Sequence, residues 1–431
     1  MTEELLAFLE ASPTCFHAVD NIRGILMENG YTELREAAGW ELQEGGKYFT
    51  VRNGSSLIAF QIPTKQYTGF MIGASHCDSP AFKIKENPEI VSGGYTRLNV
   101  EGYGGMLCGP WFDRPLSIAG RIVVRTENGL ETKTVDLDRD LVMMPSLAIH
   151  MDRGANKGHE YNIQKEMCPI LGQEGEAGIL MRMVAEEAGV KAEDILGHDL
   201  FLYARVKGTV WGKDNEFVSC GHLDDLQCTY GDLQGFLKAH PAQSVPVLAV
   251  FDNEEVGSMS KQGAFSTFLE DVLARIHIAC GRSEEERRAV PASSFMVSAD
   301  NAHAVHPAYM EKADPVNRPQ MNKGIVIKYS ANQKYTTDAV SAAVFKELCT
   351  RAEVPYQIFT NRSDMVGGST LGNLSNVHVS LNTVDIGLAQ LAMHSPYETA
   401  GTKDTQYLAD VMALFFSSSL HTGAPGCYTI R

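Results

Sequence analysis

Val247-Leu-Ala-Val-Phe-Asp-Asn-Glu-Glu-Val-Gly257 joins an apolar run to a pair of carboxylates. The run from Val247 to Phe251 predicts a strand that is buried on both faces of a sheet. Glu254 and Glu255 follow that strand, at the end where ligands bind in open α/β sheets. Buried carboxylates are costly unless their charge is compensated, and a divalent metal could compensate one of them. In an extended chain the second carboxylate would point the opposite way and stay free as a base. The alternative interpretation is that Glu254 and Glu255 lie in a solvated acidic turn.

The composition is that of a large globular protein. The chain has 431 residues, of which 44% are hydrophobic, enough for more than one domain. Its formal net charge of −16 argues against binding to nucleic acids or anionic membranes. No apolar run approaches the roughly 18 residues of a membrane span, and the acidic N-terminus lacks the basic region of a signal peptide. Nine cysteines with no Cys-x-x-Cys pair indicate reduced thiols, so we expect a cytoplasmic protein.

The first helix is predicted to begin at Ser12-Pro13, because serine is a good N-cap and proline suits the first helical turn. Its apolar residues fall on one face and Gly30 ends it, so its role is packing. His17 lies in this helix and is interpreted as structural.

A second apolar strand runs from Gly69 into His76-Cys-Asp78. Residues two apart in a strand share a face, so His76 could ligate a metal while Asp78 binds its other ring nitrogen or steadies the site. Cys77 points to the other face and is interpreted as a buried thiol.

From about residue 87 to 207 the chain changes to clustered glycines and short alternating runs, which predict a β-rich insert. Asn128-Gly129 predicts a hairpin turn, and a helix is expected from Ile179 to Ala188 before a strand from Leu200 to Val206. The glycines do not match a dinucleotide-binding loop, because Gly102-x-Gly104 lacks the third glycine. His150 ends an apolar run, which on its own favours a structural histidine.

Further strand endings carry acidic or histidine side chains after the insert. Strands are expected to end at Asp224, at Asp300 and before His394, with a helix from Thr337 to Arg351 between the last two. The complete set at strand ends is His76, Asp224, Glu254 with Glu255, Asp300 and His394. Two histidines and several carboxylates suit a pair of zinc ions with one bridging carboxylate, and leave one carboxylate as a general base. This is chemistry for activating water against a carbonyl group.

These segments resemble the aspartyl aminopeptidase and vacuolar aminopeptidase I family of dinuclear zinc peptidases. The resemblance is carried by the motifs SHCDSP, LDD, FDNEEVGS, SADNAHAVHP and QLAMHS. It extends over nearly the whole chain, through SPTCFHAV, WFDRPLSIAGRI, SLAIHMDR and VIKYSANQKYTTDAV.

The resemblance implies a role for each motif residue. His76 and Asp300 are expected to bind one zinc, and Glu255 and His394 the other. Asp224 is expected to bridge the two ions, with a cis peptide bond to Asp225. The expected catalytic residues are Glu254, as general base, and Asp78; the substrate-binding candidates are His150, which reaches a neighbouring subunit's site, His303 beside the metals, and Lys328 in a pocket for acidic substrates.

The resemblance also implies an architecture. An α/β catalytic domain with a mixed sheet and helices on both faces, residues 1–86 and 208–431, is expected to be interrupted by a β-rich dimerisation domain, residues 87–207. Homo-oligomers built from dimers, up to a dodecamer, are implied as well. The chain departs from the family pattern at Asp225, where Asn is common, at Cys77, where Thr is common, and at Asn301, where Met is common.

The predicted function is removal of the N-terminal residue from peptide substrates, with a possible preference for Asp or Glu there. Two zinc ions per subunit are the expected cofactors, and cobalt or manganese could substitute. Other dinuclear zinc hydrolases, such as a carboxypeptidase or an amide deacylase, share such ligand sets and are the alternative. A non-catalytic assembly protein is the further alternative, against which the intact ligand set and Glu254 count.

Overall fold

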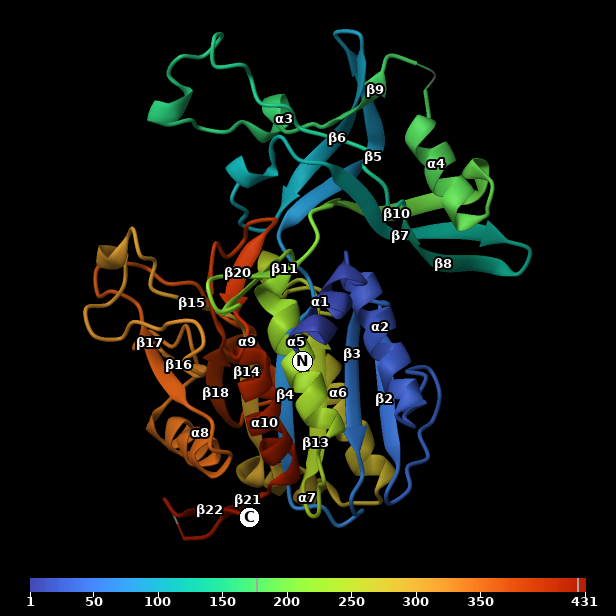
Figure 1. Ribbon diagram of the computed structural model, residues 1–431. Helices are drawn as coiled ribbons and strands as arrows, with labels where there is room; N and C mark the ends of the chain where they lie inside the picture. The colour runs from blue at the N-terminus through green and yellow to red at the C-terminus, as the bar shows by residue number, and fades with distance from the viewer. Residues whose placement is uncertain (176, 425) are drawn as a thin grey trace.

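A nine-stranded mixed sheet forms the centre of the computed structural model (Figure 1), which describes residues 1–175, 177–424 and 426–431. Its strand order is β1-β2-β3-β13-β4-β14-β18-β16-β17. The strands span, in chain order, Thr32–Glu33, Lys47–Arg52, Ser56–Gln61, Phe70–His76 (β4), Val245–Phe251 (β13), Phe295–Ala299 (β14), Ile325–Tyr329, Tyr356–Thr360 and Asn382–Gly387 (β18).

The four middle strands are parallel. β13 pairs with β4, β4 with β14 and β14 with β18, all in the same direction, whereas β3 and β16 join this group in antiparallel register. Every residue of β13 is buried, as its apolar run predicts. The carboxyl ends of β13, β4 and β14 therefore meet at one edge of the sheet.

Helices cover both faces of this sheet, so the predicted α/β fold class is confirmed. One face packs against α1 (Thr2–Glu10), α2 (Cys15–Glu28), α5 (Leu223–Leu237), α8 (Ala339–Arg351) and α10 (Asp404–Ser417). The other face packs against α6 (Phe268–Ala279) and α9 (Leu371–His378). The short helix α7 spans Glu284–Ala289.

A second, six-stranded sheet stands above the central sheet in Figure 1. It is antiparallel, with the order β8-β7-β10-β5-β6-β9, and it has its own apolar core. Its strands span Ala81–Ser92 (β5), Tyr95–Tyr103 (β6), Leu116–Thr126 (β7), Gly129–Asp136 (β8), Ile170–Gln173 (β9) and Ile195–Ala204 (β10), with helices α3 (Ile163–Glu166) and α4 (Ile179–Ala188). The predicted hairpin at Asn128-Gly129 joins β7 to β8, and the left-handed Gly189 ends α4 as expected.

A five-stranded sheet, β11-β12-β20-β19-β15, lies beside the carboxyl ends of the central strands. Its strands span Thr209–Trp211, Phe217–Cys220 (β12), Ala302–His303 (β15), Ala389–Leu391 (β19) and Glu398–Gly401 (β20). The C-terminal strands β21 (Leu420–Thr422) and β22 (Tyr428–Ile430) form a separate pair.

Several predicted boundaries were wrong. The first helix of the chain is α1, whose short apolar pattern was not recognised, and α2 begins at Cys15 after an extended Thr14 instead of at Ser12. Helix α8 begins at Ala339, because Asp338 and Ser341 form a capping box. The predicted strand from Leu200 is longer and begins at Ile195. None of the helices in the described part of the chain is long and apolar enough to cross a membrane.

Candidate metal centre

Three neighbouring strands of the central sheet deliver acidic and histidine side chains to one edge. β4 ends at His76, and Asp300 directly follows β14. Beyond β13, Glu254 and Glu255 lie in a one-turn 3₁₀ helix, Glu254–Val256, and not in the extended chain that the sequence suggested. The turn begins at Asn253 in the left-handed region, which changes the direction of the chain so that both carboxylates reach the same cluster.

The other two side chains follow strands of the five-stranded sheet. The strand ending predicted at Asp224 was wrong, because β12 ends at Cys220 and Asp224 lies in the first turn of α5. A strand does end before His394, which lies in a turn after β19. His222, two residues before Asp224, has a positive φ of 62°, and His394 itself has a positive φ of 66°, so the chain changes direction sharply at both places. The peptide bond between Asp224 and Asp225 is cis, as the resemblance implies.

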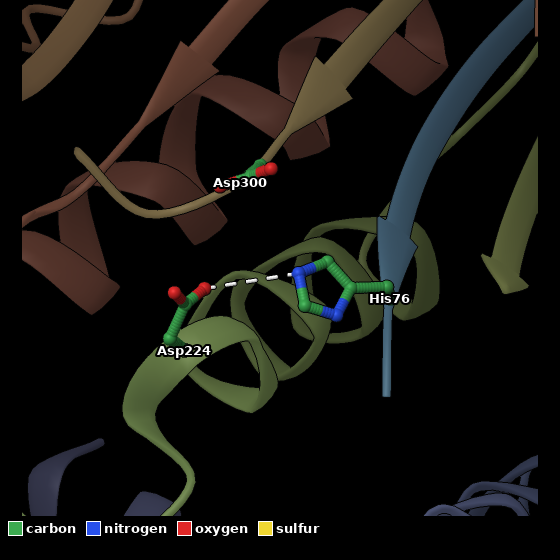
Figure 2. Close-up of side chains that lie close together, drawn as sticks. All are labelled: His76, Asp224 and Asp300. Carbon is green, nitrogen blue, oxygen red and sulfur yellow. Dashed lines mark ion pairs between the residues drawn. The ribbon is translucent and has the colours of Figure 1, made fainter. Parts of the chain in front are cut away.

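These side chains form three overlapping groups of potential metal ligands, two of which share Asp224. His76, Asp224 and Asp300 make up one of these two, and Asp224, Glu255 and His394 the other. His76, Glu254 and Glu255 make up the third group; within each group, the ligand atoms lie within 4.8 Å of one another. A carboxylate oxygen of Asp224 lies 3.7 Å from Nε2 of His76, and the other lies 3.5 Å from Nε2 of His394. Figure 2 shows His76 and Asp224 pointing toward each other, with Asp300 beside them.

The donor set fits zinc. Within the described residues, Asp224 Oδ1 and Glu255 Oε1 are buried and have no hydrogen-bond partner in the protein. Buried carboxylate oxygens without partners are costly, so their presence here indicates that a cation completes the site. Imidazole nitrogens with carboxylate oxygens are ligands that zinc accepts, and Asp224 offers one oxygen to each of the two groups that share it.

Burial and mutual repulsion dominate the electrostatics of the cluster. Burial raises the pKa of Glu254 to about 8, with His76 opposing the shift and Asp300 adding to it. Burial likewise raises the pKa of Asp300, which the Lys328 ammonium partly offsets. Although burial opposes it, contact with Asp224 raises the pKa of His394 to about 9. Protons therefore occupy this cluster in the absence of cations, and bound metal must displace them.

Asp78 binds the backbone of the turn that carries Glu254 and Glu255. Its Oδ1 accepts a hydrogen bond from the Glu254 amide, 3.1 Å, and its Oδ2 one from the Glu255 amide, 3.2 Å. Nδ1 of His76 lies 3.1 Å from the Asp78 carbonyl, which leaves Nε2 directed at Asp224. The His-x-Asp spacing led us to expect such support of His76, a candidate metal ligand.

Glu398 is a residue of the site that sequence reasoning missed. Its two carboxylate oxygens accept from the amides of Asp224, 2.9 Å, and His394, 2.7 Å, so it fixes both ligands of the five-stranded sheet. Glu398 is 2% exposed, and burial raises its pKa to about 8. The sequence shows only an acidic residue at the start of a short strand, and such residues are too common to indicate a functional site.

Two of the three positions at which the chain was expected to depart from the family pattern, Asp225 and Asn301, are hydrogen-bonded to each other. Asp225 accepts from the amides of His76, 3.3 Å, and Asn301, 3.1 Å. Nδ2 of the Asn301 side chain donates to the side-chain oxygens of Gln227 and Gln390, at 3.1 and 2.9 Å. Asp and Asn at these two positions therefore support each other, and Cys77 lies on the far side as a buried thiol.

The three predicted substrate-binding residues lie in different places. Lys328 is buried and donates to Asp300 Oδ1, 3.2 Å, and to the Asn301 carbonyl, 2.9 Å. His303 is exposed beside the cluster, where surrounding protein and then the Lys328 ammonium lower its pKa. His150 is exposed in the insert and does not line the cavity at the cluster as the described residues define it.

A cavity of about 330 Å³ opens directly onto the cluster. The metal-ligand candidates line it, together with Lys328, Tyr335 and Phe359. His303 and Phe359 also border a second cavity, of about 540 Å³. The two cavities therefore share part of their lining.

Comparison with known proteins identifies the family. The family model described as Aminopeptidase I zinc metalloprotease (M18) matches residues 8–416. This chain is an M18 aminopeptidase. The probable M18 family aminopeptidase 2 of Clostridium acetobutylicum is 46% identical over 96% of this chain and 98% of its own length. The chain is therefore a metalloaminopeptidase of a zinc metalloprotease family, and the carboxypeptidase, deacylase and non-catalytic alternatives are not supported.

Solved structures give the same family. The M18 chain resembles one in the Ape4 and Nbr1 complex with a TM-score of 0.94 at 36% identity, covering 96% of this chain and 85% of the other. It resembles the S. cerevisiae mApe1 dodecamer with a TM-score of 0.85 at 28% identity, covering 96% of each chain.

Proposed function

We propose that this M18 aminopeptidase hydrolyses the first peptide bond of peptides with water activated between two zinc ions. The observation that carries the proposal is the position of Asp224, whose two oxygens face the two ligand histidines. His76 and Asp300 would hold one ion, Glu255 and His394 the other, and Asp224 both. When bound, the ions lower the pKa of water and polarise the scissile carbonyl.

Glu254 is the general base in this proposal. It belongs to neither group that contains Asp224, and its only group is the third one, with His76 and with Glu255 of the same turn. Its raised pKa fits a group that accepts a proton from water and later returns it to the leaving amine. Nearby metal cations favour its ionised form, which is the form a base requires.

A preference for acidic N-terminal residues is the finer part of the proposal, and Lys328 supports it. The Lys328 ammonium lies in the wall of the cavity at the cluster. Two of its three donors already serve Asp300 and Asn301, so at most one remains for a substrate carboxylate. His303 borders the same cavity and is placed to contact the substrate or the developing oxyanion.

Assembly completes the proposal. The mApe1 dodecamer supports a homo-oligomer for this chain, built from dimers through the insert at about residues 87–207. His150, exposed on the insert, would then reach the active site of a neighbouring subunit. A cytoplasmic location is consistent with the nine free cysteines.

The substitution Glu254→Gln tests the base. It preserves size and removes the proton acceptor, so kcat should fall by about 10²–10⁴ while both zinc ions stay bound. Steady-state kinetics on unblocked dipeptides and metal analysis of the same sample provide the two readings. The control is Glu285→Gln, at an exposed position of α7, which should leave kcat unchanged. A near-normal kcat in Glu254→Gln would remove Glu254 from this role.

A further inference from the structure

We propose that Tyr103, on strand β6 of the insert, is a positioning residue for the acidic turn that carries Glu254 and Glu255. Its hydroxyl donates a hydrogen bond of 2.7 Å to Asp78 Oδ2. Asp78 accepts the amides of both glutamates, so the tyrosine acts on the turn through the carboxylate that organises it. The inference deepens the proposed function, because it concerns the same turn.

The Tyr103 hydroxyl is itself held from the other side. Asn253, the left-handed residue that opens the turn, donates from Nδ2 to the Tyr103 hydroxyl, 2.9 Å. Gln262 donates to Oδ1 of Asn253, 2.7 Å, and fixes the orientation of that amide. Tyr103 therefore links the first residue of the turn to the carboxylate that binds its next two amides.

The direction of this hydrogen bond does not change with pH in the working range. Burial, and then the charge of Asp78, raise the pKa of Tyr103, so the phenol keeps its proton. Asp78 is 3% exposed and lies near Asp252, another buried carboxyl group. Without the phenol, Asp78 Oδ2 would lose its one side-chain donor among the described residues, and its carboxylate would be freer to rotate away from the turn.

The ring of Tyr103 belongs to the insert, not to the catalytic sheet. Tyr103 pairs with Ala81 in the β5–β6 ladder, and its ring packs edge-on against Phe201 of β10, with centroids 5.6 Å apart. The hydrogen bond to Asp78 thus crosses from the insert sheet to the edge of the central sheet, where the two meet in Figure 1.

The residues after Tyr103 contact His394, a member of the group formed by Asp224, Glu255 and His394, as well. The carbonyl of Gly105 lies 2.6 Å from Nδ1 of His394, and the amide of Leu107 donates to the His394 carbonyl, 3.0 Å. A Cβ on Gly104, which has φ +74°, would lie 3.2 Å from Cβ of Glu255. The chain at the end of β6 is therefore packed against the turn and against His394.

The test is Tyr103→Phe, which removes only the hydroxyl. We expect kcat to fall by about 10-fold or more, with KM within about twofold of the wild-type value and zinc content and thermal midpoint unchanged. Tyr203→Phe is the matched control, because Tyr203 is also half-buried in the insert and donates to an aspartate, Asp136 Oδ1, at 2.7 Å. That control should keep wild-type kcat.

A double-variant cycle with Asp78→Asn shows whether Tyr103 acts through Asp78. The double variant should be no slower than Asp78→Asn alone, whereas fully additive losses would overturn the proposal. So would a kcat for Tyr103→Phe within twofold of wild type, an equal loss in Tyr203→Phe, or full recovery with excess zinc. An active Glu254→Gln variant would remove the base assignment without bearing on this cycle, so the two failures are distinguishable.

Discussion

Asp224 is the residue that two of the three ligand groups share. Each of its oxygens faces a different histidine, and its amide is fixed by Glu398. In the sequence, Asp224 is one acidic residue among several. Asp224 and His394 reach the cluster because the chain changes direction sharply at His222 and at His394, and no local sequence pattern predicts these turns. Glu398 and Tyr103 were missed because each acts through two hydrogen bonds to residues distant in the sequence.

Asp232 should make the stability of the protein depend on pH. It is fully buried in α5, neither carboxylate oxygen has a hydrogen-bond partner among the described residues, and burial raises its pKa well above the usual value. Because the folded-state pKa is raised, the neutral Asp232 carboxyl group costs no stability below the unfolded pKa of about 3.9. Between the unfolded and the folded pKa, the free energy of unfolding falls by about 1.4 kcal/mol per pH unit, and the loss is complete once the pH has passed the folded pKa.

The measurement is urea unfolding of wild type and Asp232→Asn between about pH 5 and 9. The variant should gain stability relative to wild type as pH rises within this range. Asp410→Asn, at an exposed position of α10, is the control and should follow the wild-type profile. A constant difference between wild type and Asp232→Asn across the range would show that the carboxyl group is not held protonated.

At the scale of elements, the strands of the central sheet were the most predictable part. β4, β13 and β14 are short apolar runs with polar residues directly after them, and parallel pairing then brings His76, the Glu254 turn and Asp300 to one edge. Helix ends were less predictable, since caps such as Asp338 compete with other polar residues nearby. The one-turn helix at Glu254 was not predictable, because it depends on Asp78 accepting its amides.

The packing of α5 on α10 depends on Gly235. A Cβ there would lie 2.6 Å from Cβ of Met412 and 2.9 Å from the Ala413 amide nitrogen. Gly235→Ala should therefore destabilise the protein by about 1–3 kcal/mol through overpacking. Gly24→Ala is the opposite control, because nothing lies within 4 Å of the new Cβ on α2, and it should stabilise by about 0.5–1 kcal/mol. Urea midpoints measure both, and equal effects of the two substitutions would contradict this account of the interface.

At the scale of the whole molecule, the insert and the catalytic sheet meet at the metal cluster. The six-stranded sheet has its own core, yet its strand β6 ends against His394 and the acidic turn. His150 lies elsewhere on the insert and is exposed. We therefore expect activity to depend on assembly, with His150 acting on the site of a neighbouring subunit.

Mixing two inactive variants tests this dependence. His150→Ala keeps a complete metal site, and Glu254→Gln keeps the histidine. If subunits exchange, mixed dimers should combine the intact site of one variant with the histidine of the other and recover part of the activity. No recovery, with exchange verified by native mass spectrometry of tagged subunits, would mean that His150 does not act across a subunit boundary.

Zinc titration of the metal-free protein tests the two-ion cluster most directly. Turnover of an unblocked dipeptide is followed while zinc is added in fractions of an equivalent per chain. Because Asp224 offers one oxygen to each of the two groups that share it, we predict that turnover reaches its plateau only at two equivalents. A plateau at one equivalent, or full turnover without added metal, would contradict the two-ion account.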